Sequence, residues 1–178
     1  ASPLQVLRDT FDLMPKETAA QWVHIAARLE GLGAAFRGYI ASLEEGRRNK
    51  RPVAKRQVEA CLKQCELHAS DHSYFNDLPR QASDVDVAST LMDRILVGVD
   101  SAKSAYRHLG EYLETDYLPS AAVKDAVGLE RYQFEARRFL GADIDLETTY
   151  RWGWEEARRT LEEMRDVGHE IDPTLQIS

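Results

Sequence analysis

The residues best suited to metal chemistry are two cysteines and two histidines, Cys61, Cys65, His68 and His72. Their spacing of four, three and four places all of them near one face of a helix. One zinc ion cannot use all four, because eleven residues of helix rise about 16 Å and zinc ligands lie about 2.0–2.3 Å from the metal. The pair His68 and His72 could hold a metal with help from another helix. The structural alternative is two buried cysteines beside a solvated, histidine-rich helix end.

The two cysteines are also unsuited to a disulfide. On a helix, Cβ atoms four residues apart are about 5–6 Å from each other, whereas a disulfide needs roughly 3.5–4.5 Å. Cys61 and Cys65 are therefore expected to be reduced thiols, which agrees with a cytoplasmic location.

Motifs of the common hydrolases are absent from the sequence. The only His-Glu pair is His169-Glu170, and Pro173 stands where the second histidine of H-E-x-x-H would be. A glycine-rich phosphate loop, a G-x-S-x-G elbow and a C-x-x-C pair are also missing. No catalytic, cofactor-binding or metal-ligating residue is therefore assigned to this chain.

A basic run, Arg47–Arg51, is followed closely by Lys55 and Arg56. Such a run could attract phosphate, but it is more typical of a solvated loop, and the chain has a net charge of −7. The sequence also lacks an apolar run of about 18 residues and the apolar core of a secretory signal. We expect no nucleic-acid partner, no membrane partner and a cytoplasmic location.

The elements that position these residues are predicted to be helical almost throughout, because no segment alternates with period two. Residues 1–17 are predicted to be irregular. Thr18 followed by Gln21 is a capping-box pattern that opens the first long helix. Its apolar stripe comprises Trp22, Ile25, Leu29, Gly33, Phe36, Ile40 and Leu43. Three glycines indicate a kink or a close crossing in this helix: Gly31, Gly33 and Gly38.

A second helix is predicted to begin at Pro52, which suits a first helical position, and to end near Ala69. Residues 70–81 are predicted to be a polar connection. Ser83 with Asp86 suggests the next N-cap. The following helix has a seam in four-three spacing, typical of bundle packing, formed by Ala88, Met92, Ile95, Val99, Ala102, Tyr106, Leu109 and Leu113.

The last third of the chain is predicted to contain two helices. Gly128 opens the first, which stops at Gly141, and Asp145 caps the second, which ends at Gly168. The second helix should direct inward Leu146, Tyr150, Trp154, Ala157, Leu161 and Met164. The whole pattern predicts an all-α bundle of about five to six mostly antiparallel helices with short loops, forming a single domain over residues 1–178.

Two glycines and two tryptophans of this region depart from plain helix periodicity. Gly153 lies inside a helix, where it costs about 1 kcal/mol relative to alanine, and so indicates close packing or a functional surface. Trp154 is expected in the core, while Trp152 points elsewhere and suits an interface. Glu130 and Tyr132 are two residues apart and so face nearly opposite sides. Tyr132 is expected to pack in the core, with Glu130 either solvated or turned toward a ligand.

Several separated motifs resemble the bacterial domain-of-unknown-function 885 family. They are Asp-Ala-Val-Gly-Leu-Glu-Arg-Tyr at 125–132, Phe-Leu-Gly-Ala-Asp at 139–143 and Tyr-Arg-Trp-Gly-Trp-Glu-Glu-Ala at 150–157. The segments at 8–15 and 39–43 also resemble that family's middle region. The motifs occur in the family's order and cover most of the chain.

The resemblance implies a helical zinc peptidase of the gluzincin type, with a deep cleft and an H-E-x-x-H motif downstream of the matched region. This chain would then be one segment of a longer enzyme and part of the cleft's helical wall. Zinc is expected only in that longer protein. The positions that match family motifs are candidate cleft residues without an assigned catalytic role: Gly128, Glu130, Tyr132, Gly153 and Trp154.

Three functions are therefore weighed. The first is a non-catalytic segment of a metallopeptidase-like hydrolase, whose partner is the remainder of its own polypeptide or a second copy. The second is a stand-alone helical protein-interaction domain. The third is a thiol or metal sensor that uses Cys61 and Cys65. A segment should expose a contiguous apolar patch where its missing part docks, whereas a self-sufficient domain should cover both Trp152 and the 88–113 seam.

Overall fold

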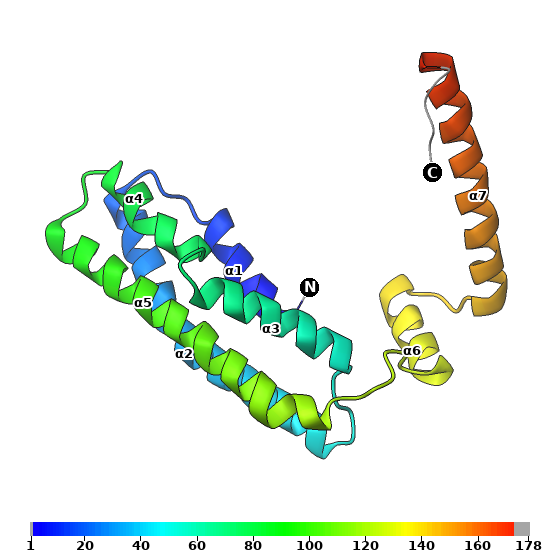
Figure 1. The fold of residues 1–178 in the computed structure, drawn as a ribbon, viewed down its shortest axis with the longest axis horizontal. Coiled ribbons are helices and arrows are strands. Elements are labelled where there is room, and N and C mark those ends of the chain that lie inside the picture. Colours follow the sequence, from blue (N-terminus) through cyan, green and yellow to red (C-terminus); the bar gives the residue numbers. More distant parts are fainter. Residues whose placement is uncertain (1, 173–178) are drawn as a thin grey trace. The chain divides into compact units, whose positions relative to one another are not determined.

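The computed structural model describes residues 2–172, and these form an all-α fold, as predicted (Figure 1). The chain divides into two compact units, residues 1–125 and 126–178, a boundary that the sequence did not indicate. The first unit contains α1 (Pro3–Leu13), α2 (Ala19–Arg48), α3 (Lys55–Ala69), α4 (Leu78–Ser83) and α5 (Ser89–Tyr112). Its short turns are η1 (Tyr74–Asp77), the π turn η2 (Leu113–Tyr117) and η3 (Leu118–Ser120). The second unit contains α6 (Leu129–Leu140) and α7 (Leu146–Ile171).

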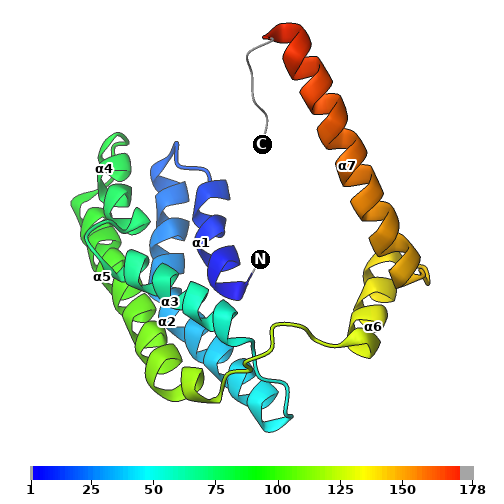
Figure 2. The ribbon, with the colours of Figure 1, turned by 45° about the vertical axis from the view of Figure 1, so that its right-hand side comes forward.

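The centre of the first unit is the pair α2 and α5, which lie side by side in Figures 1 and 2. They run parallel, because their contacts advance together along both helices. Arg94 of α5 pairs with Glu30 of α2 at 3.0 Å, and farther along Tyr106 packs edge-on against Phe36 with ring centroids 4.8 Å apart. We expected antiparallel neighbours, which short loops produce. The helices α2 and α5 can run parallel because α3 and α4 lie between them in the chain.

The close helix crossing occurs at Gly98 of α5 and at none of the three glycines predicted for it in α2. A Cβ at Gly98 would lie 3.0 Å from the Cβ of Leu29. At Gly31 and Gly38 it would meet nothing within 4 Å, and at Gly33 only the Arg37 side chain at 3.6 Å. The helix α2 runs unbroken through these positions. The apolar stripe of α2 and the seam of α5 are otherwise buried largely as predicted.

The prediction that residues 1–17 are irregular is wrong, because α1 occupies most of that stretch. Ser2 and Gln5 form a capping box, in which the Ser2 backbone N–H donates to Gln5 Oε1 at 2.9 Å. Pro3 is compatible with a helix at its first position. Leu4 and Phe11, seven residues apart on one face, are fully buried. The helix then stops at Leu13, just before Met14-Pro15.

The start of α3 also differs from the prediction, at Lys55 and not at Pro52. The Val53 N–H donates to Tyr117 Oη at 2.9 Å, and the Val53 carbonyl accepts from the Ala122 N–H at 3.0 Å. The Lys55 N–H donates back to the Ala122 carbonyl at 2.7 Å. This short bridge holds the chain extended in front of the helix, and residues far apart in the sequence form it.

The polar connection predicted for residues 70–81 is instead partly helical. It contains η1 and α4, which bury Phe75, Leu78 and Ala82 at intervals of three and four residues. Ser83 does not cap the next helix: its hydroxyl donates to the Arg80 carbonyl at 2.6 Å and closes α4. The sequence did not predict this helical spacing, because most residues between the buried apolar ones are polar.

In the second unit, the predicted boundaries of α6 and the predicted start of α7 are confirmed. Gly128 precedes α6, and Gly141 ends it in the left-handed conformation with φ of 72°. Asp145 caps α7, accepting the Thr148 N–H at 2.6 Å. The helix ends at Ile171, three residues beyond the predicted Gly168. Among residues 2–172, no helix combines the length and apolarity needed to cross a membrane.

Candidate functional site

The five family-motif residues all lie in the second unit, on or beside α6 and α7. Gly128 has a φ of 85°, which an L side chain rarely adopts, so its backbone conformation accounts for the glycine. A Cβ at Gly153 would meet nothing within 4 Å, and φ there is helical. Neither glycine therefore makes a close packing contact with a described residue.

All apolar residues of α6 except Phe134 form one narrow face, since helix residues turn by about 100° each. This face comprises Leu129, Tyr132, Ala136, Phe139 and Leu140. The prediction that Tyr132 packs in a core is wrong, because 57% of its surface is exposed. Glu130 is exposed as well, at a different side of the helix. No residue of α6 is buried.

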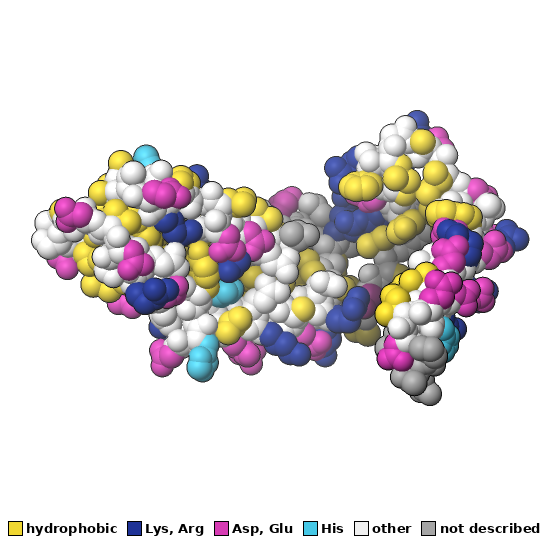
Figure 3. Space-filling model, turned by 90° about the horizontal axis from the view of Figure 1, so that it is seen from above, with side chains coloured by type: hydrophobic (Ala, Val, Ile, Leu, Met, Phe, Trp, Pro, Cys, Tyr) yellow, Lys and Arg dark blue, Asp and Glu magenta, His cyan; other side chains and the backbone are white. Residues whose placement is uncertain are grey.

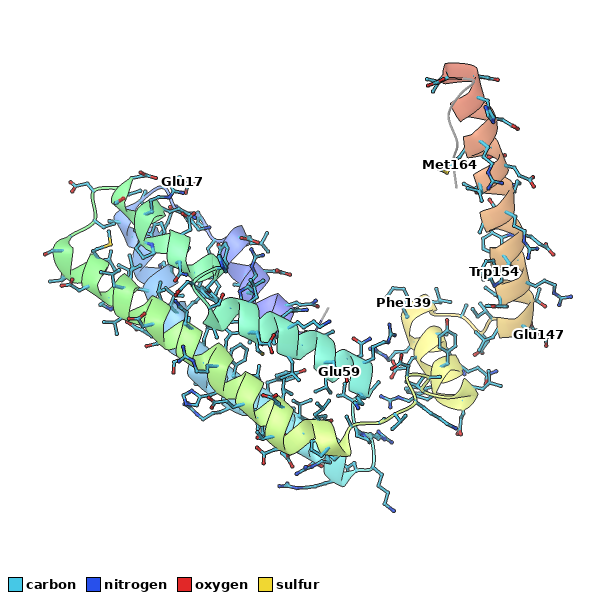
Figure 4. All side chains as sticks on the ribbon, in the orientation of Figure 1. Glu17, Glu59, Phe139, Glu147, Trp154 and Met164 are labelled. Atoms are coloured by element: carbon cyan, nitrogen blue, oxygen red, sulfur yellow. The ribbon has the colours of Figure 1, made fainter. Side chains whose placement is uncertain are left out.

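The α7 stripe is the longer apolar face, covering the whole helix on one side. We define it as Leu146, Tyr150, Gly153, Trp154, Ala157, Leu161, Met164, Val167, Gly168 and Ile171. Trp154 and Met164 mark its course in Figure 4, and hydrophobic side chains appear on the surface of this part of the chain in Figure 3. The periodicity that continues past Gly168 to Ile171 was a signal that the sequence prediction missed.

Within the second unit, the α7 stripe does not point into a core, contrary to the prediction. Trp154 is 52% exposed, and Tyr150, itself 68% exposed, packs edge-on against it with ring centroids 6.2 Å apart. Leu161 is half-buried and Gly168 alone is buried. Trp152 is exposed, as predicted, and lies outside the stripe. Helical periodicity therefore identified the apolar face correctly, but the second unit by itself does not cover it.

Local interactions hold α7 helical without a core. The Asp145 carboxylate accepts the Thr148 N–H at the first turn, which holds the pKa of Asp145 below its usual value. On the polar side, Arg159 pairs with Glu156 and with Glu163 at helical spacing. These pairings raise the pKa of Arg159 and lower that of Glu156. The polar face is thus solvated and internally paired, which leaves the α7 stripe as the face available for packing.

A shallow hollow of about 340 Å³ lies beside α6 and the loop that follows it. Its lining includes Phe134, Ile144 and Leu146, together with Arg137 and Asp143. The Arg137 guanidinium and the Asp143 carboxylate are 3.6 Å apart, so the two charges offset each other. The hollow is mixed in character and offers no set of groups typical of catalysis.

Cys61, Cys65 and His68 lie in α3, and His72 follows shortly after it. His68 is buried rather than part of a solvated helix end, which corrects the prediction, whereas His72 is exposed. No group of three or more His, Cys, Asp or Glu residues suited to a metal ion occurs among residues 2–172. Pro173, which replaces the second histidine of H-E-x-x-H, lies outside the described residues.

Both thiols are free, as predicted. Burial raises the pKa of Cys65 to about 12 and also raises the pKa of Cys61. Because the thiolate is the reactive form, these values do not favour the sensor hypothesis.

The basic run near the end of α2 is largely paired with nearby carboxylates. Arg47 pairs with Glu44 at 2.6 Å, and Arg56 pairs with Asp125 at 2.5 Å. Glu45 and Glu59 lie within 4 Å of Arg48 and Lys55 respectively. This pairing reduces the positive field that the basic run presents to an anionic partner.

The fold thus defines an all-α protein whose second unit presents an uncovered amphipathic helix. A family model described as "Bacterial protein of unknown function (DUF885)" matches residues 1–177, and the chain belongs to that family. A search among curated proteins finds no matching sequence.

Proposed function

We propose that the chain is a non-catalytic helical segment of a zinc metallopeptidase-like hydrolase and forms part of the wall of its substrate cleft. The proposal starts from the membership of the chain in the DUF885 family and from the resemblance of that family to helical gluzincins. Residues 2–172 offer no ligand set for zinc. In this proposal the metal ligands and catalytic groups belong to another part of a longer polypeptide, in the cytoplasm.

The exposed α7 stripe carries the proposal. Burying one large apolar side chain contributes about 1.5–3 kcal/mol, and the stripe holds several that are more than half exposed, including Tyr150, Trp154 and Met164. Gly153 and Ala157 lie four residues apart in the stripe, so a partner backbone could approach closely at this point. This arrangement gives Gly153 a role that its open surroundings in the chain alone do not provide. We infer that the remainder of the polypeptide covers the stripe.

The test compares this chain with the protein encoded by its complete reading frame. We expect the chain alone to bind an apolar dye and to hydrolyse no peptide, while the longer protein binds zinc, hydrolyses peptides and binds less dye. In the longer protein, Trp154→Glu should reduce the folded yield and activity strongly. Trp152→Glu, outside the stripe, is the matched control and should have a much smaller effect.

Hydrolysis by the 178-residue chain alone would overturn the assignment as a non-catalytic segment. A complete reading frame without an H-E-x-x-H motif would remove the peptidase assignment. Equal effects of the two tryptophan substitutions in the longer protein would contradict the covering of the stripe.

A stand-alone interaction domain is the second candidate, and one observation favours it. The α5 seam, including Ile95, Ala102 and Leu109, is buried within the first unit, so that unit closes its own core. The stripe would then bind a second copy or another protein. Sedimentation of the chain distinguishes the two cases: a dimer whose formation protects Trp154 from a fluorescence quencher supports this candidate, and a dye-binding monomer contradicts self-association.

A further inference from the structure

His68 of α3 is a titratable side chain enclosed by aromatic rings. It is 9% exposed, and its ring centroid lies 4.8 Å from that of Tyr106 in α5 and 5.9 Å from that of Phe75 in η1. Its Nδ1 is buried without a hydrogen-bond partner among the described residues. Neutral imidazole can keep this nitrogen unprotonated, but imidazolium carries N–H on both nitrogens. Protonation would therefore bury a charge and a donor that has no acceptor, which is costly.

The helix α1 docks on the same rings. Phe11 packs edge-on against Phe75 with centroids 5.4 Å apart, and the Leu4 carbonyl accepts from Tyr106 Oη at 3.4 Å. The Arg8 guanidinium lies 4.3 Å from the ring centroid of Tyr74 in η1. Leu4 and Phe11 are the fully buried side chains of α1. The helix also contacts α2, so the ring cluster supplies only part of its attachment.

The charged group that acts on His68 comes from α1. Burial lowers the pKa of His68, and the positive charge of Arg8 lowers it further. On α1, Asp9 and Asp12 pair with Arg8 and partly offset its charge. The other titratable neighbours are neutral near pH 7, because burial raises the pKa of Tyr74 and of Cys65 in α3 to about 12.

The helices α5 and α2 contribute aromatic rings to this cluster, and Lys103 of α5 bonds to Asn76 and Asp71. Burial raises the pKa of Tyr106 in α5 as well. The helix α2 contributes Phe36, which packs on Tyr106. Protonated His68 would thus meet aromatic rings and the cation of Arg8.

We propose that His68 is an acid-sensitive switch for the docking of α1, so that α1 leaves α3, η1 and α5 when the imidazole is protonated while the rest of the first unit stays packed. The neutral ring stabilises docking fully above its unfolded-state pKa of about 6.5. That contribution is lost progressively as the pH falls below this value toward the lower pKa of the docked state. With one proton taken up, the opening equilibrium constant rises by at most about tenfold for each pH unit.

The test is amide hydrogen exchange of the full 178-residue chain between about pH 7.5 and about pH 5, corrected for intrinsic exchange rates. We expect the opening constant of α1 to rise up to about tenfold per pH unit below about pH 6.5, with little change in the middle of α5. His68→Phe keeps the ring contacts and cannot titrate, so it should abolish the dependence. His72→Phe replaces an exposed histidine four residues away and should keep it.

Three results would overturn the proposal: no dependence of α1 exchange on pH, the same dependence in His68→Phe, or an equal rise in α1 and α5. If circular dichroism shows that His68→Phe does not fold, His68→Gln serves as the second non-titrating variant, with the same expectation.

Discussion

Trp22 and Trp154 occupy similar places in two amphipathic helices with opposite outcomes. Each lies on the apolar face of a helix that begins at a side-chain cap, Thr18 for α2 and Asp145 for α7. Trp22 is completely buried, whereas Trp154 is about half exposed. The difference comes from the surroundings: α1 and α5 pack against α2 within the first unit, whereas α6, the other helix of the second unit, does not cover the α7 stripe. An apolar stripe therefore identifies the face that can be buried and leaves its cover undetermined.

The largest effect is expected when each tryptophan is replaced with alanine. Trp22→Ala should destabilise the first unit by about 3–5 kcal/mol, since it leaves a cavity in a packed core and removes the indole N–H bond to the Lys16 carbonyl, 3.0 Å long. Trp154→Ala should change the free energy of unfolding by less than about 0.5 kcal/mol. Denaturant unfolding followed by far-ultraviolet circular dichroism measures both values. Similar losses at the two sites would mean that α7 is covered in solution.

Substitution of Gly98 and Gly153 tests the same comparison, with a smaller expected change in the free energy of unfolding. Gly98→Val should destabilise the first unit by about 1–3 kcal/mol through overpacking, because even a Cβ there would be 3.0 Å from the Cβ of Leu29. Gly153→Val places the same side chain where a Cβ meets nothing within 4 Å, and valine has the higher helix propensity. It should leave the unfolding free energy unchanged or slightly higher. Thermal and denaturant unfolding of both variants provides the measurement, and a clear loss at Gly153 would contradict its open surroundings.

The smallest expected effect concerns the cap of α7. The Asp145 carboxylate has a lowered pKa because it accepts the Thr148 N–H. Its stabilising contribution is therefore present above the unfolded-state pKa of about 3.9 and is lost as the pH falls through the lower pKa of the folded state. Asp145→Asn keeps a capping acceptor but should remove this pH dependence, as seen by amide exchange in the first turn of α7. The same acid sensitivity in Asp145→Asn would show that another group is responsible.

Much of the local structure could be predicted from the sequence, because it depends on neighbouring residues. The capping box at Thr18 and the cap at Asp145 satisfy backbone donors within three residues. Gly141 ends α6 because a left-handed residue closes a helix at low cost when it is glycine. Apolar periodicity likewise identified the faces of α2, α5 and α7. The candidate positions of the second unit were placed on the correct helices for the same reason.

The errors arose where a distant part of the chain decides the outcome. The start of α3 is set by Ala122 and Tyr117, more than sixty residues away in the sequence. The parallel direction of α2 and α5 depends on the path that α3, η1 and α4 take between them, and residues 70–81 showed no clear period. The burial of His68 required α1, η1 and α5 to meet around it.

The sequence by itself determined an all-α protein, most helix boundaries, and which side of each helix is apolar, because hydrogen bonds and side-chain directions within a helix depend on residues a few positions apart. Only the tertiary structure decided which apolar faces are covered: it buried Trp22 and His68 and left Tyr132 and Trp154 exposed. Burial depends on which surfaces approach from elsewhere in the chain, and helical periodicity carries no information about the partner.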